Sequence, residues 1–334
     1  MSRRLITIGA ALLAAGLGVE AGRFLLFAPD GEPRDVVVEV PDGAALAAVA
    51  RQLAGAGVVS HPRYFTLLGQ LLNADRAIQA GDYAFNTGMR PLEVLGRLTS
   101  GSVIQIAVTI PEGFTAREIA AHLEAQELMP AEGFLAAAHD PALIKELGLT
   151  APSAEGYLFP STYYITRRTT PEELARRMVQ EFRNATREWD WTGNGRPTLT
   201  PHQVVTLASI IEKETSLDEE RPLVAAVFYN RLRRRMPLQS DPTVIYGLAG
   251  FDGNLRKADL SKKTPYNTYV IYGLPPGPIA NPGAASLTAA LHPSPVDYLY
   301  FVSKNDGSHV FSSTLADHQR AVARYQLKRV RGKG

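Results

Sequence analysis

An internal repeat constrains the fold of this chain more than any other feature of its sequence. The segment Val40–Leu53 recurs as Ile110–Leu123, at an offset of 70 residues. Each copy has a β-rich run before a Pro-acid-Gly turn and a helical apolar pattern after it. In the second copy, Thr115 and Glu118 form a capping box that marks the expected helix start. Because two copies are too few for a solenoid, we interpret them as two related small α/β modules.

The composition excludes several classes of protein. The chain has 334 residues, 45% of them apolar and 20% charged, which is enough for about two domains with buried cores. It contains no cysteine, and this excludes disulfide frameworks, thiolate metal sites and cysteine nucleophiles. The formal net charge of +2 is too balanced to predict a nucleic-acid partner.

The N-terminal segment has the pattern of a membrane anchor. Arg3 and Arg4 precede an uncharged, mostly apolar run from Leu5 to Val19, and continuation through Phe27 makes it long enough to span a bilayer. The arginines place the N-terminus on the cytoplasmic side. A cleaved signal peptide is the main alternative, and a buried helix of a cytosolic domain is another. We expect an uncleaved anchor over residues 1–28 and a Pro/Gly-rich linker over 29–34.

The helix expected from Thr200 onward ends in the acidic sequence Glu212-Lys213-Glu214. Residues two apart are separated by about 200° on a helix, so the two glutamates cannot share a face. Glu214 continues the more apolar edge, over Ile211, Ile210 and Leu207. A carboxyl held against apolar groups has a raised pKa and is suited to act as a general acid. A solvated glutamate at a frayed helix end is the alternative interpretation.

The sequence after this helix is rich in amides, carboxylates and aromatic rings at Pro/Gly turns, over residues 236–247, 266–269 and 273–283. Such groups suit a sugar, because rings pack on its CH faces and amides bind its hydroxyl and acetamido groups, although ordinary turn chemistry also explains the prolines. The basic run Arg231–Arg235 suggests a solvated helix end rather than a nucleic-acid site. The histidines show no ligand spacing, so we expect no metal.

Several long motifs occur in one order and resemble a known family. They are ASIIEKET at 208–215, Glu220-Arg221, VFYNRL at 227–232, LQSDPTVIYGL at 238–248, YNTY at 266–269, GLPPGPIANPG at 273–283, ALHP at 290–293 and YLYFV at 298–302. Together they closely resemble the YceG-like (MltG) family of endolytic murein transglycosylases, and the resemblance covers the whole chain after the anchor. Ser240 departs from the family pattern, which leads us to expect threonine at that position.

The resemblance implies a fold of class α+β. It implies LysM-like α/β modules at 35–150 and a mostly helical catalytic domain at 151–334, with a short β-sheet near residues 298–313. It places a bacterial protein in the inner membrane as a single-pass chain, with the catalytic domain on the periplasmic side. The partners it implies are peptidoglycan glycan strands and, further, peptidoglycan synthases (penicillin-binding proteins). No cofactor and no nucleic acid are expected.

The resemblance also implies the chemistry, that of a lyase. Glu214 matches the family's catalytic glutamate and would protonate the glycosidic oxygen between N-acetylmuramic acid and N-acetylglucosamine. The 6-hydroxyl of the muramyl sugar would then close a 1,6-anhydro ring, which limits the length of nascent strands. Positions matching family motifs are substrate-binding candidates: Gln239, Asp241, Tyr246, Asn267, Tyr269 and Asn281.

Two alternative functions remain open from the sequence. A muramidase would use water as the nucleophile, with Asp241 or Glu219 as a second carboxylate. A peptidoglycan-binding scaffold for synthases would bind strands through its LysM-like modules without depending on cleavage.

Overall fold

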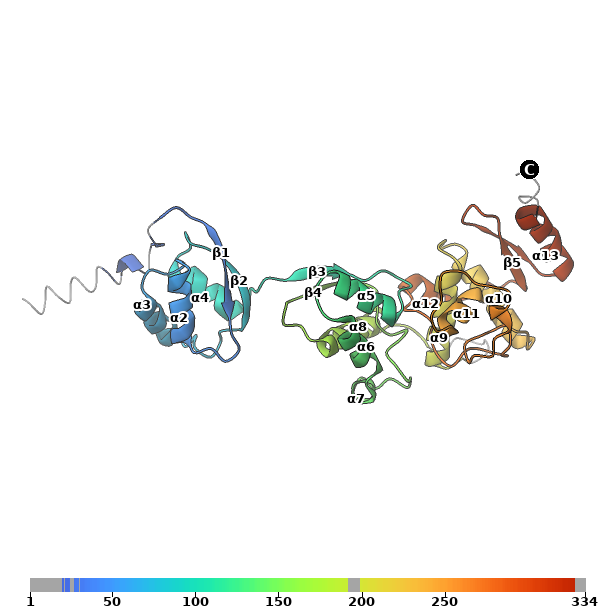
Figure 1. Ribbon diagram of the computed structural model, residues 1–334, viewed down its shortest axis with the longest axis horizontal. Helices are drawn as coiled ribbons and strands as arrows, with labels where there is room; N and C mark the ends of the chain where they lie inside the picture. Colours follow the sequence, from blue (N-terminus) through green and yellow to red (C-terminus); the bar gives the residue numbers. More distant parts are fainter. Residues whose placement is uncertain (1–19, 21, 25–26, 30, 192–198, 328–334) are drawn as a thin grey trace, which may run out of the picture. The chain divides into compact units, whose positions relative to one another are not determined.

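A computed structural model describes residues 20, 22–24, 27–29, 31–191 and 199–327. These residues form an α+β fold with three two-stranded sheets, which pair β1 with β2, β3 with β4, and β5 with β6 (Figure 1). The chain divides into two compact units. Unit 1 comprises residues up to 107 together with 164–168, and unit 2 comprises 108–163 together with 169–334. This division falls at 107, whereas the sequence motifs suggested a boundary at 150.

Unit 1 contains the first copy of the repeat. Its elements are β1 (Asp35–Val40), α2 (Leu46–Gly55), α3 (Pro62–Leu71), β2 (Gly81–Asn86) and α4 (Pro91–Ser100). The strands pair antiparallel, with Val38 opposite Tyr83 and Val36 opposite Phe85. Because side chains alternate along a strand, Val38, Val40, Tyr83 and Phe85 all face the core. The helices cover that face and bury Leu53, Phe65 and Leu98.

Unit 2 is mostly helical. The division between the units runs through two strands, β3 (Ile106–Thr109) and β4 (Thr162–Ile165). The first helices of unit 2 are α5 (Ala116–Ala125), α6 (Ala131–His139), α7 (Pro141–Glu146), α8 (Pro171–Ala185), α9 (Pro201–Glu214), α10 (Arg221–Arg233) and α11 (Asp241–Gly247). They are followed by the 3-10 helix η1 (Asp259–Ser261), α12 (Ala284–Leu291), β5 (Tyr300–Ser303), β6 (His309–Ser312), α13 (Leu315–Val322) and the π-helical η2 (Ala323–Leu327). The sheet expected near residues 298–313 is the antiparallel pair β5–β6.

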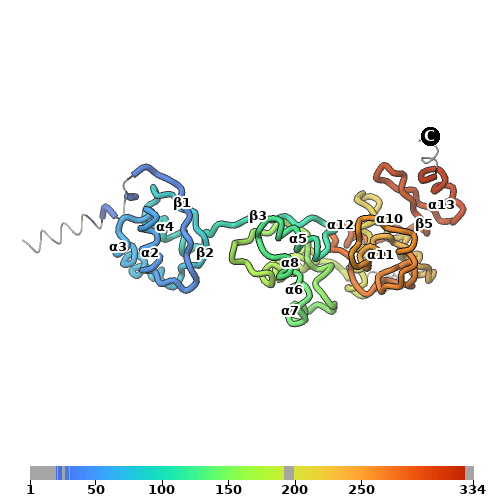
Figure 2. The backbone as a smooth tube through the Cα atoms, viewed as in Figure 1, coloured from blue at the N-terminus to red at the C-terminus, as the bar shows by residue number. Residues whose placement is uncertain are grey.

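Helix α9 is the central element of unit 2. All eight residues from Val204 to Ile211 are buried, since α9 packs against α10, α11 and α12 (Figure 2). The first turn of α9 is more exposed, and its free backbone amides are capped by neighbouring side chains. Thr200 accepts a hydrogen bond from the Gln203 amide and Gln203 reaches back to Thr200, with Pro201 at the first helical position. The capping box expected at Thr115 and the helix expected from Thr200 onward are both confirmed.

The expected membrane anchor lies almost entirely outside the described residues. Within the part of the chain that the structure describes, no helix has both the length and the apolar character needed to cross a membrane. Within the expected anchor, Gly22–Phe24 are helical, and Phe24 packs in the core of unit 1, so this residue contacts protein rather than lipid.

Candidate active site

Glu214 is the last residue of α9, at the point where the chain leaves the helix. Thr215 turns to extended backbone and donates its amide to the carbonyl of Ile211. The side chain of Glu214 is partly accessible, although it is surrounded by residues of α10, the 238–241 segment and the 266–269 loop. The carboxyl at the helix end is therefore packed against protein groups and is only partly exposed to solvent.

Ser240 is the direct partner of Glu214. Its hydroxyl donates to Glu214 Oε1 at 2.5 Å. Ser240 is itself held by two threonines, because its amide donates to Thr268 Oγ1 at 3.0 Å and its carbonyl accepts from Thr243 Oγ1 at 2.6 Å. The serine hydroxyl is thus fixed in place by the start of α11 and the 266–269 loop.

Arg231 supplies positive charge behind the site. The guanidinium is buried and donates through Nε to the Leu299 carbonyl at 2.8 Å and through Nη1 to the Leu238 carbonyl at 2.8 Å. It also lies over the Tyr300 ring, 5.4 Å from its centroid. The expectation that the whole run 231–235 is a solvated helix end is wrong for Arg231, whose position on α10 follows the buried residues Val227 and Phe228 by one helical turn.

Burial raises the pKa of Glu214 to about 7. The hydrogen bond from Ser240 and the charge of Arg231 favour the carboxylate and oppose this shift, whereas the nearby Asp241 adds to it. A carboxyl with a pKa near 7 is protonated often enough at neutral pH to donate a proton and is readily regenerated as a base. The side chain has the properties of a general acid.

The other residues of the acidic motif hold the end of α9 in place. Glu212 pairs with Arg221 at 3.3 Å and accepts the Gly283 amide at 3.0 Å, and its side chain is 6% exposed. Lys213 donates through Nζ to the Gly113 carbonyl at 3.1 Å. The two glutamates therefore occupy different faces, as the helical geometry predicts, and Glu212 has a structural role.

Three of the predicted binding residues lie beside Ser240. Gln239 is exposed, and its Oε1 accepts from Arg231 Nη1 at 3.2 Å. Asp241 is exposed and accepts from the Tyr269 hydroxyl at 2.7 Å. An amide, a carboxylate and a phenol are thus gathered next to Glu214, where they can bind the hydroxyl and amide groups of a sugar.

Asn267 and Asn281 do not line a cleft, and this corrects the sequence-based assignment. Both are fully buried. Asn267 Nδ2 donates to the carbonyls of residues 259, 260 and 262, and its Oδ1 accepts the amide of Tyr269. Asn281 Oδ1 accepts the amides of Gly156 and Leu158, and its Nδ2 donates to Phe114 and Glu155. Their hydrogen-bonding groups are used to fix loops.

Tyr246 belongs to a second buried carboxyl site. Its hydroxyl donates to Glu155 Oε2 at 3.2 Å, and Glu155 also accepts the Ala116 amide at the start of α5. Burial raises the pKa of Glu155 to about 7 against these hydrogen bonds. Glu155 was not among the site residues predicted above, although a carboxylate two residues before the apolar run Tyr157-Leu158-Phe159 was a usable signal.

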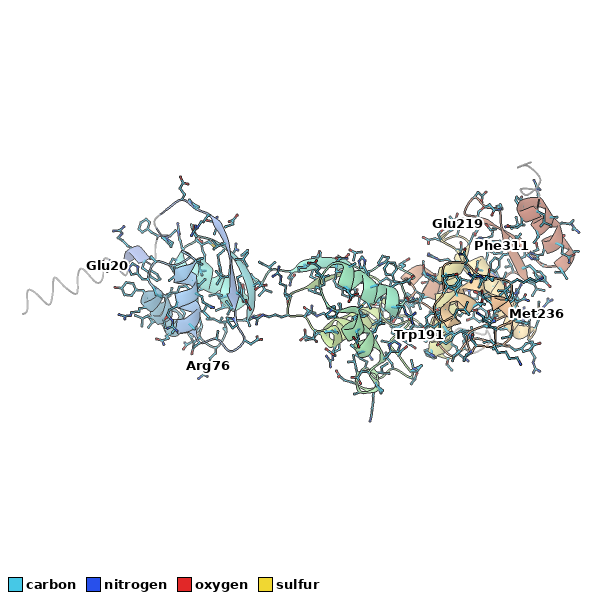
Figure 3. All side chains as sticks on the ribbon, in the orientation of Figure 1. Glu20, Arg76, Trp191, Glu219, Met236 and Phe311 are labelled. Carbon is cyan, nitrogen blue, oxygen red and sulfur yellow. The ribbon has the colours of Figure 1, made fainter. Side chains whose placement is uncertain are left out.

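The described side chains include no group of three His, Asp or Glu residues placed to hold a metal ion. Glu219, the other carboxylate considered as a second catalytic group, is exposed and is labelled in Figure 3. The site is therefore one partly accessible acid flanked by a hydroxyl, a guanidinium and exposed polar groups, which is an arrangement of the kind used to cleave glycosidic bonds by general-acid catalysis.

Comparisons with known proteins identify the family. Residues 38–324 match the model of the YceG-like family. The chain is 33% identical to a protein of Bacillus subtilis (strain 168) named endolytic murein transglycosylase, covering 91% of this chain and 89% of that protein. It is 31% identical to a protein of the same name from Streptococcus pneumoniae (strain D39), where the match covers 87% of this chain and 58% of the relative. The chain belongs to the YceG-like family.

A solved structure supports the fold. The crystal structure of a yceG-like protein from Listeria monocytogenes aligns with a TM-score of 0.56 at 30% sequence identity. The alignment covers 86% of this chain and 98% of that structure.

Proposed function

We propose that this chain is an endolytic murein transglycosylase that uses Glu214 as its catalytic acid. The observation that carries the proposal is the carboxyl of Glu214, which has a pKa of about 7 and is hydrogen-bonded by Ser240 at the end of the family's acidic motif. The relatives named for this activity support the reaction class, and peptidoglycan is the corresponding substrate.

The reaction needs one carboxyl in two protonation states. Neutral Glu214 donates its proton to the oxygen of the β-1,4 bond between N-acetylmuramic acid and N-acetylglucosamine, and an oxocarbenium-like centre develops at the muramyl anomeric carbon. The muramyl 6-hydroxyl attacks this carbon and transfers its proton to the Glu214 carboxylate. The products are a free 4-hydroxyl on N-acetylglucosamine and a 1,6-anhydromuramyl end, and the acid is restored.

Ser240 and Arg231 contact or face the Glu214 carboxyl in both its neutral and its ionised form. Because Ser240 donates to Oε1, the proton of neutral Glu214 sits on Oε2, which is the oxygen available to the substrate. After proton transfer, the serine hydroxyl and the Arg231 charge stabilise the carboxylate. Gln239, Asp241 and Tyr269 bind the sugar beside this acid in the proposed complex.

The organisation around the catalytic part is also proposed. Residues 1–28 contain the anchor, with the uncharged run Leu5–Val19 in the bacterial inner membrane and the N-terminus in the cytoplasm, and residues 151–334 act on the periplasmic side. The strand–helix–helix–strand order of β1, α2, α3 and β2 supports a LysM-like module that binds glycan. Cleavage of nascent strands beside peptidoglycan synthases would then terminate their elongation.

Mass spectrometry of glycan products tests the proposal. The full chain in detergent is incubated with uncross-linked peptidoglycan strands, next to Glu214→Gln and the control Glu219→Gln, which alters an exposed carboxylate. We expect anhydro ends from the wild type and the control, and a loss of about 100-fold or more in Glu214→Gln. Reducing ends would instead identify a muramidase, and intact strands with retained binding would identify a scaffold.

A further inference from the structure

Helix α3 of unit 1 exposes an unusual set of large apolar side chains. Leu67, Leu71 and Leu72 are 53%, 71% and 54% exposed. Leu67 and Leu71 are four residues apart and therefore lie on one face of the helix, while Phe65 and Gly69 face the core. We call Leu67, Leu71 and Leu72 the leucine face. Contiguous apolar groups on a surface mark a contact with a partner or a membrane.

Two arginines lie beside the leucine face. A groove of about 410 Å³ between α2 and α3 is lined by Arg51, Arg63 and Leu67, together with Thr66 and Gln70. Both arginines are exposed, and no acidic side chain lines this groove. Apolar side chains next to guanidinium groups fit the boundary between lipid tails and phosphate headgroups, because the apolar groups then contact the tails and the guanidinium groups contact the phosphates.

The N-terminal segment leads directly to this helix. Phe24 is 5% exposed and packs edge-on against Tyr64 of α3 and His61 just before it, with ring centroids 5.8 and 6.3 Å apart. The uncharged run ends at Val19, five residues earlier in the sequence. Five residues span at most about 18 Å. Through this short tether, Phe24, and with it α3, therefore lies within about that distance of Val19, the end of the uncharged run.

We propose that the leucine face of α3 rests on the lipid surface from which the chain emerges, with Arg51 and Arg63 at the level of the phosphates. The inference rests on the proposed anchor, since the tether brings α3 to the bilayer. The leucines then enter the interface and the arginines bind lipid phosphates, so unit 1 is held against the membrane instead of moving freely on its linker. The lipid surface is preferred to a protein partner because the tether length and the basic groove both match it.

The absence of cysteine from the chain permits a site-specific test. The full chain carrying Leu71→Cys is labelled with an environment-sensitive fluorophore and reconstituted in vesicles of phosphatidylcholine and phosphatidylglycerol. The matched control is Val37→Cys, because Val37 is an apolar residue of β1 that is 65% exposed. We expect blue-shifted emission and severalfold stronger quenching by lipid-borne spin labels at position 71 than at position 37. Adding Arg51→Glu and Arg63→Glu to the Leu71→Cys chain reduces that quenching.

Equal, water-like emission at both positions in vesicle-bound protein would overturn the lipid contact. A chain that does not float with the vesicles would overturn the anchor and this inference together. Glycan cleavage by the same labelled samples is measured in parallel, so a failure of the proposed enzymatic function is recognised separately.

Discussion

Ser240 controls the protonation of Glu214 through a single hydrogen bond. Its hydroxyl donates to Oε1 and so favours the carboxylate, against the burial that favours the neutral acid. These two effects, together with the opposing charges of Asp241 and Arg231, leave the pKa near 7. The departure from threonine noted in the sequence preserves this function, because both residues carry a hydroxyl on Cβ.

Removal of that hydroxyl shifts the pH dependence of catalysis. In Ser240→Ala, the pKa of Glu214 rises, and since the acid is active when protonated, activity extends to higher pH. A hydrogen bond to a charged group contributes about 1.5–3 kcal/mol, so we expect the alkaline limb of kcat/KM to move up by about one to two pH units. Ser240→Thr serves as the control and keeps the wild-type profile. An unchanged alkaline limb in Ser240→Ala would contradict this role.

The predicted binding residues separate into two kinds that can be told apart by experiment. Asn281→Ala leaves the buried amides of Gly156 and Leu158 without their acceptor, which lowers the free energy of unfolding by about 1–3 kcal/mol. Gln239→Ala, at an exposed position beside the acid, changes stability by about 0.5 kcal/mol or less and raises KM for glycan strands. Urea unfolding and steady-state kinetics measure both effects. A stable Asn281→Ala protein with a raised KM would instead show that Asn281 binds the substrate.

At the scale of elements, the turns of the two repeat copies have different structural roles. The turn of the second copy contacts the end of α9, because Gly113 accepts from Lys213 and donates its amide to the Asn281 carbonyl. In the first copy, a Cβ added to Gly43 would meet nothing within 4 Å. The second turn is therefore part of the frame that holds Glu214, and the first is a surface turn of unit 1.

The matched glycines of these turns provide a test. Both have positive φ, +65° at Gly43 and +76° at Gly113, so alanine costs about 1 kcal/mol at each. A Cβ at Gly113 would be in ordinary contact with Glu212 Cγ, at 3.4 Å, so the effect comes from backbone strain. We expect Gly113→Ala to shift the turn that accepts from Lys213 and to lower kcat severalfold. Gly43→Ala keeps wild-type kcat. Thermal unfolding with parallel turnover assays measures both variants, and equal kcat in the two would refute the framing role of the second turn.

At the scale of the whole molecule, buried carboxyls make stability depend on pH. Glu214 and Glu155 both have a folded-state pKa of about 7, above the ordinary value of 4.5. The folded state therefore holds more protons on these two groups between these values, and their contribution to stability is full below about pH 4.5 and is lost as the pH rises through about 7.

Glu214→Gln removes one of these titrations. We expect the free energy of unfolding of the wild type to decrease between pH 5 and pH 8, and the decrease in Glu214→Gln to be smaller by up to about 3 kcal/mol. Denaturant unfolding at a series of pH values measures this difference. Glu219→Gln, at an exposed carboxylate, retains the wild-type slope. A slope in Glu214→Gln equal to the wild type would show that Glu214 titrates normally.

The sequence by itself determined the helix that carries the acid, since Thr200, Pro201 and Gln203 cap it locally and the spacing of Glu212 and Glu214 fixes their faces. Local capping and helical periodicity depend on neighbours in the chain, and these are visible in the sequence. Only the tertiary structure decided that Ser240 and Arg231 surround Glu214, that Asn267 and Asn281 are buried, and that Glu155 shares a network with Tyr246. Those contacts join residues far apart in the chain, and the packing of α9, α10, α11 and their loops brings them together.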